Sequence, residues 1–184
     1  MDRSPGRRTL SPSGAWEFTV APGGDLSIRR LDPPDPDARQ VDRLVDPRLA
    51  ISPAEDLLVY ARQGPLRETD LWLLRLPDGD PEPLTAWTGN EDRPVFSPDG
   101  TALAFVSGHT GIASWWRLDL GLPGPVEVQD AVQLSNVDLH KRPRQYGEPP
   151  PDFLPVPDGP EYAWTDQGLQ WTSRGRALQL PVPR

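Results

Sequence analysis

The 184-residue sequence contains no cysteine, only two histidines and a single lysine. Without cysteine, disulfides and thiolate metal sites are excluded. No apolar run approaches the roughly 20 residues that a membrane-spanning helix needs, so we expect no membrane insertion. Residues 1–8 carry charge but no apolar stretch follows them, so no signal peptide is expected in the sequence as written. The compartment is left open by these observations.

The sequence also lacks the common signatures of catalysis. It contains no GxSxG, HExxH or phosphate-cradling glycine loop, so we predict no catalytic, cofactor-binding or metal-binding residues and no enzyme activity. His109 and His140 are interpreted as solvated loop residues. The acidic pairs at 55–56 and 91–92 are interpreted as turns rather than paired acid–base carboxylates. Residues 78–80, Asp-Gly-Asp, fit a plain turn better than a calcium loop.

Positive charge is scarce relative to negative charge. The chain has 27 acidic and 19 basic residues, a formal net charge of −8. Such a surface repels phosphate backbones, so we expect no nucleic-acid partner.

Proline and glycine, in contrast, are abundant, at 25 and 16 residues. Their combined share approaches that of low-complexity chains. Seven tryptophans and several short apolar segments favour instead an all-β fold whose many turns are punctuated by proline.

One stretch organises the rest of the chain, residues 94–107 with the sequence PVFSPDGTALAFVS. Its Ser97-Pro98-Asp99-Gly100 segment fits a type I turn followed by a glycine at positive φ, which joins two antiparallel strands. A third strand is expected over 113–120 and a fourth at either 126–129 or 132–134. A meander of four short strands within about 45 residues is the unit of a β-propeller blade.

The pattern recurs along the chain. Ser-Pro pairs begin at Ser11, Ser52 and Ser97, which are 41 and 45 residues apart, and apolar strand segments follow each pair. A degraded copy follows at the C-terminus, with an expected strand over 153–156, a turn at 157–159 and three further strands. We therefore predict one propeller-type domain over 1–184, with about four blades of four-stranded antiparallel meanders at 8–47, 48–92, 93–138 and 152–184. A proline-rich surface insertion is expected at 139–151.

Two of the expected second strands, 57–61 and 102–106, are almost wholly apolar. Continuous apolar runs fit strands covered on both faces, as between stacked blades. We predict burial of Leu58, Tyr60, Trp72, Leu103 and Phe105. A short buried helix is the competing interpretation of 71–76, but this segment is too short to favour it.

The motif FSPDGxxLAFVS, followed by an aromatic third strand ending in Leu-Asp-Leu, resembles the WD-repeat-like propeller motif of the TolB family. Leu84-Thr85 resembles the Leu-Thr that ends blades in that family, and Leu134-Ser135 resembles it more weakly. The resemblance is good over 49–136, partial over 10–45 and poor at the C-terminus. It implies an interaction scaffold, often in the periplasm or cell envelope of bacteria. Propellers of the family usually have six or more blades, so four blades indicate a small ring, a partial ring, or half of an assembly.

From this we predict a non-enzymatic protein-binding or scaffolding module with a protein partner, and a homo-oligomer could complete the ring. The alternative is an accessory propeller of a hydrolase or carbohydrate-acting enzyme. A third interpretation is a structural fragment that works only within a larger oligomer. Trp115-Trp116 could form a ligand platform, but core positions are the better interpretation.

In a meander, the loops between second and third strands and those between blades emerge on one face. We call this face the loop face. Protein interfaces favour arginine and tryptophan surrounded by polar groups, so we expect a partner to bind there. The predicted loop-face residues are Arg67, Glu68, Asp70, Trp87, Asn90, Glu91, Asp92, Arg93, His109 and Thr110.

Overall fold

The computed structural model describes residues 6–121, 127–137 and 153–182. Within these ranges the chain is all-β, and its only helix is the single 3₁₀ turn η1 (Val128–Asp130). None of the described helices is long or apolar enough to cross a membrane. The expected insertion at 139–151 and His140 lie outside the described residues.

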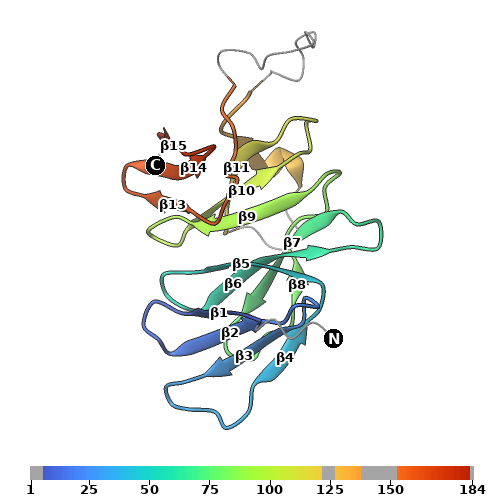
Figure 1. Cartoon of the computed structure of the whole chain (residues 1–184), viewed down its shortest axis with the longest axis vertical. Helices are drawn as coiled ribbons and strands as arrows, with labels where there is room; N and C mark the ends of the chain where they lie inside the picture. The colour runs from blue at the N-terminus through green and yellow to red at the C-terminus, as the bar shows by residue number, and fades with distance from the viewer. Residues whose placement is uncertain (1–5, 122–126, 138–152, 183–184) are drawn as a thin grey trace.

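Four antiparallel sheets follow one another along the chain and fan out side by side (Figure 1). We call each sheet a blade. The first blade consists of β1 (Arg7–Leu10), β2 (Trp16–Val20), β3 (Leu26–Arg30) and β4 (Arg39–Asp42). The second consists of β5 (Val45–Ile51), β6 (Leu57–Gln63), β7 (Thr69–Arg75) and β8 (Glu82–Pro83). The third consists of β9 (Glu91–Phe96), β10 (Ala102–Ser107), β11 (Ser114–Asp119) and β12 (Ala131–Gln133). The fourth has three strands, β13 (Tyr162–Thr165), β14 (Gly168–Ser173) and β15 (Arg176–Leu180).

The three Ser-Pro pairs form equivalent turns between the first and second strands of their blades. The hydroxyl oxygens of Ser11, Ser52 and Ser97 accept hydrogen bonds from backbone N–H groups five residues later, at 3.1, 3.0 and 3.0 Å. All three serines are buried. Because each hydroxyl satisfies a backbone donor inside the turn, the repeated serine has a structural cause. Gly100 has a φ of +74°, which confirms the predicted positive φ.

The two Leu-Thr-like pairs also have the same structure. The N–H of Leu84 donates to the carbonyl of Leu71 at 2.8 Å, and the N–H of Leu71 donates to Thr85 Oγ1 at 2.9 Å. In the third blade, the N–H of Leu134 donates to the carbonyl of Trp115 at 2.8 Å, and the N–H of Trp115 donates to Ser135 Oγ at 2.9 Å. Serine therefore replaces threonine without a change in the bonding pattern.

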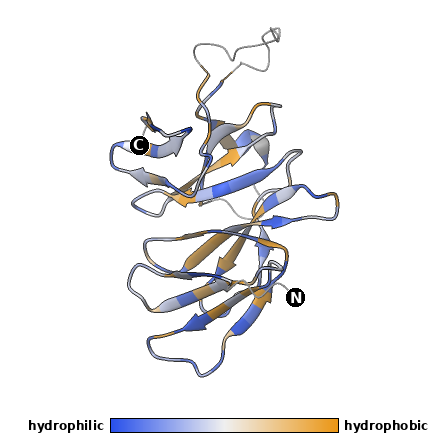
Figure 2. Ribbon diagram, in the orientation of Figure 1, coloured by the Kyte–Doolittle hydropathy of each residue, from blue (hydrophilic) through white to orange (hydrophobic). Residues whose placement is uncertain are grey.

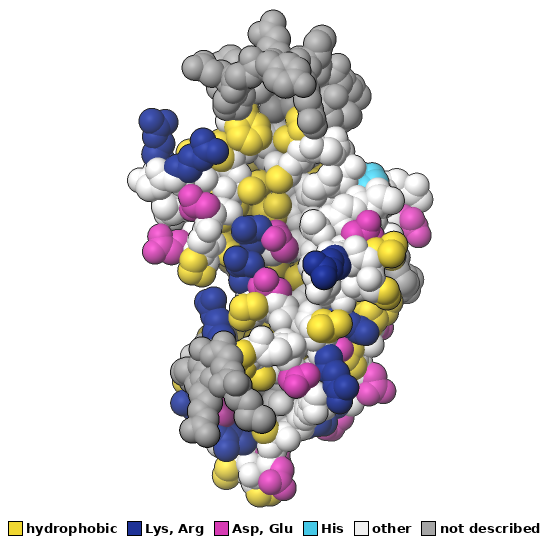
Figure 3. Space-filling model, turned by 45° about the vertical axis from the view of Figure 1, so that its right-hand side comes forward, with side chains coloured by type: hydrophobic (Ala, Val, Ile, Leu, Met, Phe, Trp, Pro, Cys, Tyr) yellow, Lys and Arg dark blue, Asp and Glu magenta, His cyan; other side chains and the backbone are white. Residues whose placement is uncertain are grey.

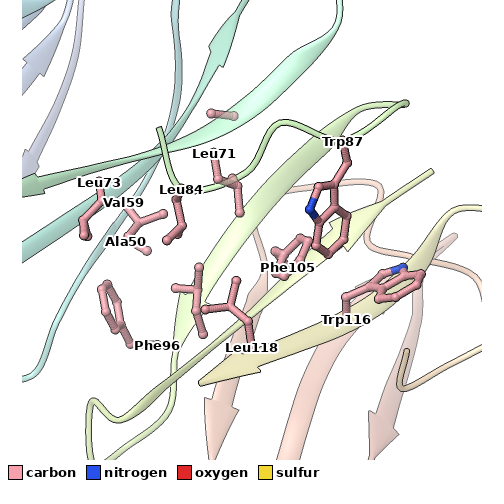
Figure 4. Packing of buried hydrophobic residues seen from close by; sticks show 12 residues of the cluster. Ala50, Val59, Leu71, Leu73, Leu84, Trp87, Phe96, Phe105, Trp116 and Leu118 are labelled. Carbon is pink, nitrogen blue, oxygen red and sulfur yellow. The ribbon is translucent and has the colours of Figure 1, made fainter. Parts of the chain in front are cut away.

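Clusters of buried apolar side chains fill the three interfaces between blades. Figure 2 shows hydrophobic residues, in orange, on the inner strands of the blades. Strand β10 shows why its sequence is apolar without alternation. Leu103 and Phe105 pack against the second blade, whereas Ala104 and Val106 pack toward the fourth. Figure 4 shows the interface between the second and third blades, where the Trp87 ring lies 5.3 Å from Phe105 and 5.4 Å from Trp116.

Four of the five residues predicted to be buried, Leu58, Tyr60, Leu103 and Phe105, have no exposed surface. Trp72 is half-buried, with the Arg62 guanidinium carbon 4.1 Å from its ring centroid.

In the fourth blade, the positions of the strands differ from the prediction. Residues 153–156 form no strand, and β13, expected as the second strand, lies beside β9 as the innermost strand (Figure 1). Pro155 lacks an N–H, and the Asn136 side chain holds both backbone groups of Leu154, at 2.7 and 2.9 Å. This segment therefore has a side-chain partner in place of a strand partner.

The outward faces of the end blades are polar, unlike the faces between blades. On the first blade, Glu17 pairs with Arg8 and, at 2.8 Å, with Arg29. On the fourth blade, Gln170 and Thr172 occupy the corresponding positions and are half-buried. The apolar stacking of blades thus stops at both ends of the described arc.

Candidate functional site

The predicted loop-face residues lie in neighbouring loops and strand ends of the second and third blades, and their exposure is uneven. Asp70 belongs to β7, and residues 91–93, expected in the linker between blades, begin β9 instead. Arg67, Glu68 and Asn90 are exposed, and Trp87 and Glu91 are buried. The others are half-buried, namely Asp70, Asp92, Arg93, His109 and Thr110. Fewer of these side chains are free for a partner than the sequence indicated.

Trp87 belongs to the core and cannot be a surface anchor without a rearrangement. Its ring packs on Phe105 and Trp116 (Figure 4), and the His109 ring covers it at 5.9 Å. His109 is held in turn by Thr88, whose Oγ1 lies 3.1 Å from His109 Nδ1. The loop histidine is therefore packed rather than merely solvated.

Glu91 is a fully buried carboxyl group beneath the loop face. Ser107 Oγ donates a hydrogen bond of 2.8 Å to Glu91 Oε1, and the N–H of His109 donates to Ser107 Oγ at 3.0 Å. Burial, together with the charges of Asp70 and Glu68, raises the pKa of Glu91 to about 7 against the opposing effect of the Ser107 hydrogen bond. The sequence indicated a solvated turn here, and the sheet register places the side chain inside instead.

A concavity lies along the innermost strands, toward the axis around which the blades are arranged. We call this concavity the axial trough; its volume is about 500 Å³. All four blades contribute to it, through β1, β5, β9, β13 and the Ser-Pro turns. Its lining comprises Arg7, Thr9, Pro12, Pro47, Arg48, Leu49, Ala50, Ile51, Pro53, Pro94, Val95, Phe96, Ser97, Pro98, Pro160, Tyr162 and Trp164. Sequence reasoning missed this site because no single segment contains it.

Two charged pairs lie beside the trough at irregularities in the innermost strands. Asp46 Oδ2 lies 2.9 Å from Arg48 Nη1 in β5, and Asp92 pairs with Arg93 in β9. Burial raises the pKa of Asp92, although the Arg93 charge opposes that shift. The matching segments Asp-Pro-Arg at 46–48 and Asp-Arg-Pro at 92–94 are the sequence signal that could have located the trough.

Aromatic side chains of β13 form one wall of the trough. Burial raises the pKa of Tyr162 to about 12, so its phenol stays neutral and can donate a hydrogen bond at neutral pH. The Arg117 guanidinium carbon lies 5.8 Å from the Trp164 ring centroid. Trp164 also borders a second groove of about 330 Å³ between the third and fourth blades.

Proline interrupts the strand edges that face the trough. Pro47 lies in β5 and Pro94 in β9, so each edge lacks a backbone donor at that position. Edge prolines prevent another strand from pairing there. A ligand in the trough would have to bind mainly through side-chain contacts.

The other motifs of the sequence have structural roles. Trp115 and Trp116 are both buried on opposite faces of β11, as core residues. Glu55 accepts hydrogen bonds from Ser13 N and Oγ at 2.6 and 2.7 Å, which ties the first two Ser-Pro turns together. Gly79 N donates to the carbonyl of Arg75 at 2.8 Å within a turn. In the part of the chain that is described, no group of three or more acidic or histidine side chains could hold a metal ion.

Successive antiparallel meanders, innermost strands around a common axis and apolar packing between sheets define a β-propeller, here as an open arc of four blades. On the face shown in Figure 3, acidic and basic side chains are interspersed without a large patch of one sign.

The fold is that of TolB-like propellers. TolB from Acinetobacter baumannii matches 94% of this chain and 40% of its own, with 14% identity and a TM-score of 0.58. The tricorn protease matches 68% of this chain and 16% of its own, with 9% identity and a TM-score of 0.56. The propeller domain of the Trilobed protease from Pyrococcus furiosus matches 73% of this chain and 44% of its own, with 12% identity and a TM-score of 0.53. No family model and no curated protein matches the sequence. The chain thus spans less than half the length of these structures.

Proposed function

We propose that this chain is a non-enzymatic protein-binding module that takes an extended segment of a partner polypeptide in the axial trough. The observation that carries the proposal is the convergence of four innermost strands on one concavity lined by arginine, tyrosine, tryptophan and proline. Tyrosine, tryptophan and arginine are the residues that most often anchor protein interfaces. The likeness to TolB supports a propeller scaffold for such binding.

The chemistry of the lining restricts the partner. Its two charged residues, Arg7 and Arg48, are both cationic, although the whole chain carries a formal net charge of −8. Arg48 also forms an ion pair with Asp46, which partly neutralises its charge. A partner segment with an acidic side chain next to apolar ones would complement the arginines and the aromatic wall.

A second candidate is an accessory propeller beside a catalytic domain. It is favoured by the likeness to the tricorn protease and to the propeller domain of the Trilobed protease. In that role the trough would still contact polypeptide, but the contacted chain would be the substrate or the catalytic domain of a hydrolase.

Photo-crosslinking tests the site directly. A photoreactive amino acid replaces Leu49 in the trough or Glu68 on the loop face, and crosslinked partners from native cells are identified by mass spectrometry. We expect a specific partner from position 49 that is lost when Arg7→Glu is combined with Arg48→Gln. A partner obtained only from position 68 would move the site to the loop face, and a hydrolase as the partner would favour the accessory role. Arg93 is a poor choice for loop-face tests because its partly buried pairing with Asp92 makes it structural.

A further inference from the structure

The side chains of the axial trough offer mainly hydrogen-bond donors. The guanidinium groups of Arg7 and Arg48 and the indole of Trp164 can only donate. The protonated phenol of Tyr162 can donate as well. Among the described residues that line the trough, none is an aspartate, glutamate, asparagine or glutamine. A ligand that suits these side chains therefore presents carbonyl oxygens and few N–H groups, and proline is the residue with a backbone carbonyl but no N–H.

The two aromatic side chains of β13 form a fixed wall for such a ligand. Tyr162 and Trp164 lie two positions apart on one strand, so both project to the same side, and both are half-buried. The Tyr162 ring meets the buried Trp115 ring edge to face, with centroids 6.1 Å apart. Arg117 lies against the Trp164 ring. Because these neighbours hold both rings, little conformational freedom would be lost on binding.

The backbone of the trough favours a polyproline II helix over an added β-strand. An added strand needs regular N–H donors along an edge, and Pro47 and Pro94 remove donors from the axial edges of β5 and β9. A polyproline II helix makes no backbone ladder, and its carbonyl groups point outward to whatever donors surround it. Two of its residues rise by about 6 Å, close to the spacing of about 6.6 Å between alternate positions of a strand. Successive turns can therefore pack on Tyr162 and Trp164.

We propose that the axial trough binds a proline-rich segment of a partner protein in the polyproline II conformation, with an acidic residue next to the prolines. The prolines would pack on the Tyr162 and Trp164 rings, and their carbonyl groups would accept hydrogen bonds from these side chains. The acidic residue would pair with the exposed Arg7. This inference rests on the proposed function and names the class of segment that the trough takes.

Isothermal titration calorimetry with three peptides of equal length and charge tests the class of ligand. The first is acetyl-Pro-Pro-Pro-Pro-Glu-Glu-amide. The second has alanine at the four proline positions, and the third has Val-Thr-Val-Thr there. We expect the proline peptide to bind at least about tenfold more tightly than either, because it brings no N–H groups from its prolines and its conformation is formed before binding. Replacing its two glutamates by glutamine should weaken binding, and Arg7→Glu should abolish that difference between the two proline peptides.

Substitutions in β13 locate the binding site. Tyr162→Phe keeps the ring and removes the donor, so we expect binding of the proline peptide to weaken by about threefold to tenfold. The indole N–H signal of Trp164 in a ¹⁵N spectrum, assigned by its absence from Trp164→Phe, should shift when the proline peptide is added. Glu68→Gln on the loop face is the control and should leave binding unchanged. The comparison of peptides needs no substitution, so it remains decisive if a variant does not fold.

Binding of the alanine or Val-Thr peptide as tight as that of the proline peptide would overturn the proposal. So would a Trp164 signal that does not move, or a proline peptide that fails to bind at millimolar concentration. The photo-crosslinking at position 49 tests the proposed function separately. A partner captured there that contains no acidic proline-rich segment would overturn this inference alone, whereas capture only from position 68 would overturn the proposed function.

Discussion

Single residues that need an unusual backbone conformation allow the predicted turns to be tested directly by substitution. Gly100 turns the chain with a φ of +74°, and an added Cβ would lie 3.2 Å from Pro53 Cδ of the neighbouring turn. Backbone and packing therefore both require glycine at this position.

We expect Gly100→Val to lower the free energy of unfolding by about 1–3 kcal/mol, because a β-branched residue is strained at positive φ. Urea denaturation followed by tryptophan fluorescence measures the change. Gly23→Val is the matched control, since nothing lies within 4 Å of a Cβ added at Gly23. Equal denaturation midpoints for the two variants would contradict the turn geometry.

Glu91 makes stability depend on pH. Its pKa is about 7 in the folded protein against 4.5 for an ordinary glutamate. Between these values the folded state keeps a proton that the unfolded state has released. The unfolded state thus binds fewer protons, and the free energy of unfolding falls as pH rises through this window.

We expect Glu91→Gln to remove this loss, so that the variant is more stable than the unsubstituted chain at pH 8 by roughly 1–3 kcal/mol and about equal to it at pH 4.5. The Gln side-chain oxygen can still accept the hydrogen bond of Ser107. Thermal unfolding of both proteins at a series of pH values checks the prediction. A stability difference that does not change with pH would show that the Glu91 carboxyl is not the titrating group.

At the scale of elements, each of the first three blades ends in a short strand that pairs with its third strand. Thr85 has no exposed surface, and its Oγ1 is the acceptor for the N–H of Leu71. A buried N–H that loses its acceptor costs about 1–3 kcal/mol.

We therefore expect Thr85→Val, which keeps the shape and removes the hydroxyl, to destabilise the protein by about that amount. Thr85→Ser keeps the acceptor, as Ser135 does in the third blade, and should destabilise less. Ser135→Ala provides the equivalent test on Trp115. Chemical denaturation of the three variants measures the effect, and a more damaging serine than valine would show that packing of the methyl group dominates.

At the scale of the whole molecule, the end faces oppose closure of the ring. The Glu17 pairs on the first blade and the Gln170 and Thr172 side chains on the fourth would lose solvation if another copy covered them. Completion of the ring by a second copy stays a prediction of the sequence, and these faces weigh against it.

We expect the chain to be monomeric by light scattering at micromolar concentration. Gln170→Leu combined with Thr172→Val should promote self-association, because it makes the fourth blade's outward face resemble the faces between blades. Arg67→Ala on the loop face serves as the control. A stable dimer of the unsubstituted chain that dissociates when Thr172 becomes charged would establish that the end faces pair.

Much of the fold could be predicted from local patterns. Turn residues at 97–100 and apolar runs such as 102–106 specify hairpins through interactions within one blade, and the blades repeat. Which segment forms the innermost strand of the fourth blade could not be predicted. The hydrogen bonds that keep Leu154 out of the sheet come from Asn136, 18 residues earlier in the sequence. The loop face was predicted from loop order alone, which places residues near one another but does not determine which side chains point inward.

The sequence by itself determined the all-β class, the repeated Ser-Pro turns and the order of strands, because these depend on backbone preferences and hydrophobic pattern within a few residues. Only the tertiary structure decided that Glu91 and Trp87 are buried and that four distant strands form one trough. Burial and concavity arise when blades pack against each other, and residues 153–156 form no strand while the Asn136 side chain binds the backbone of Leu154. These features belong to contacts between segments far apart in the chain.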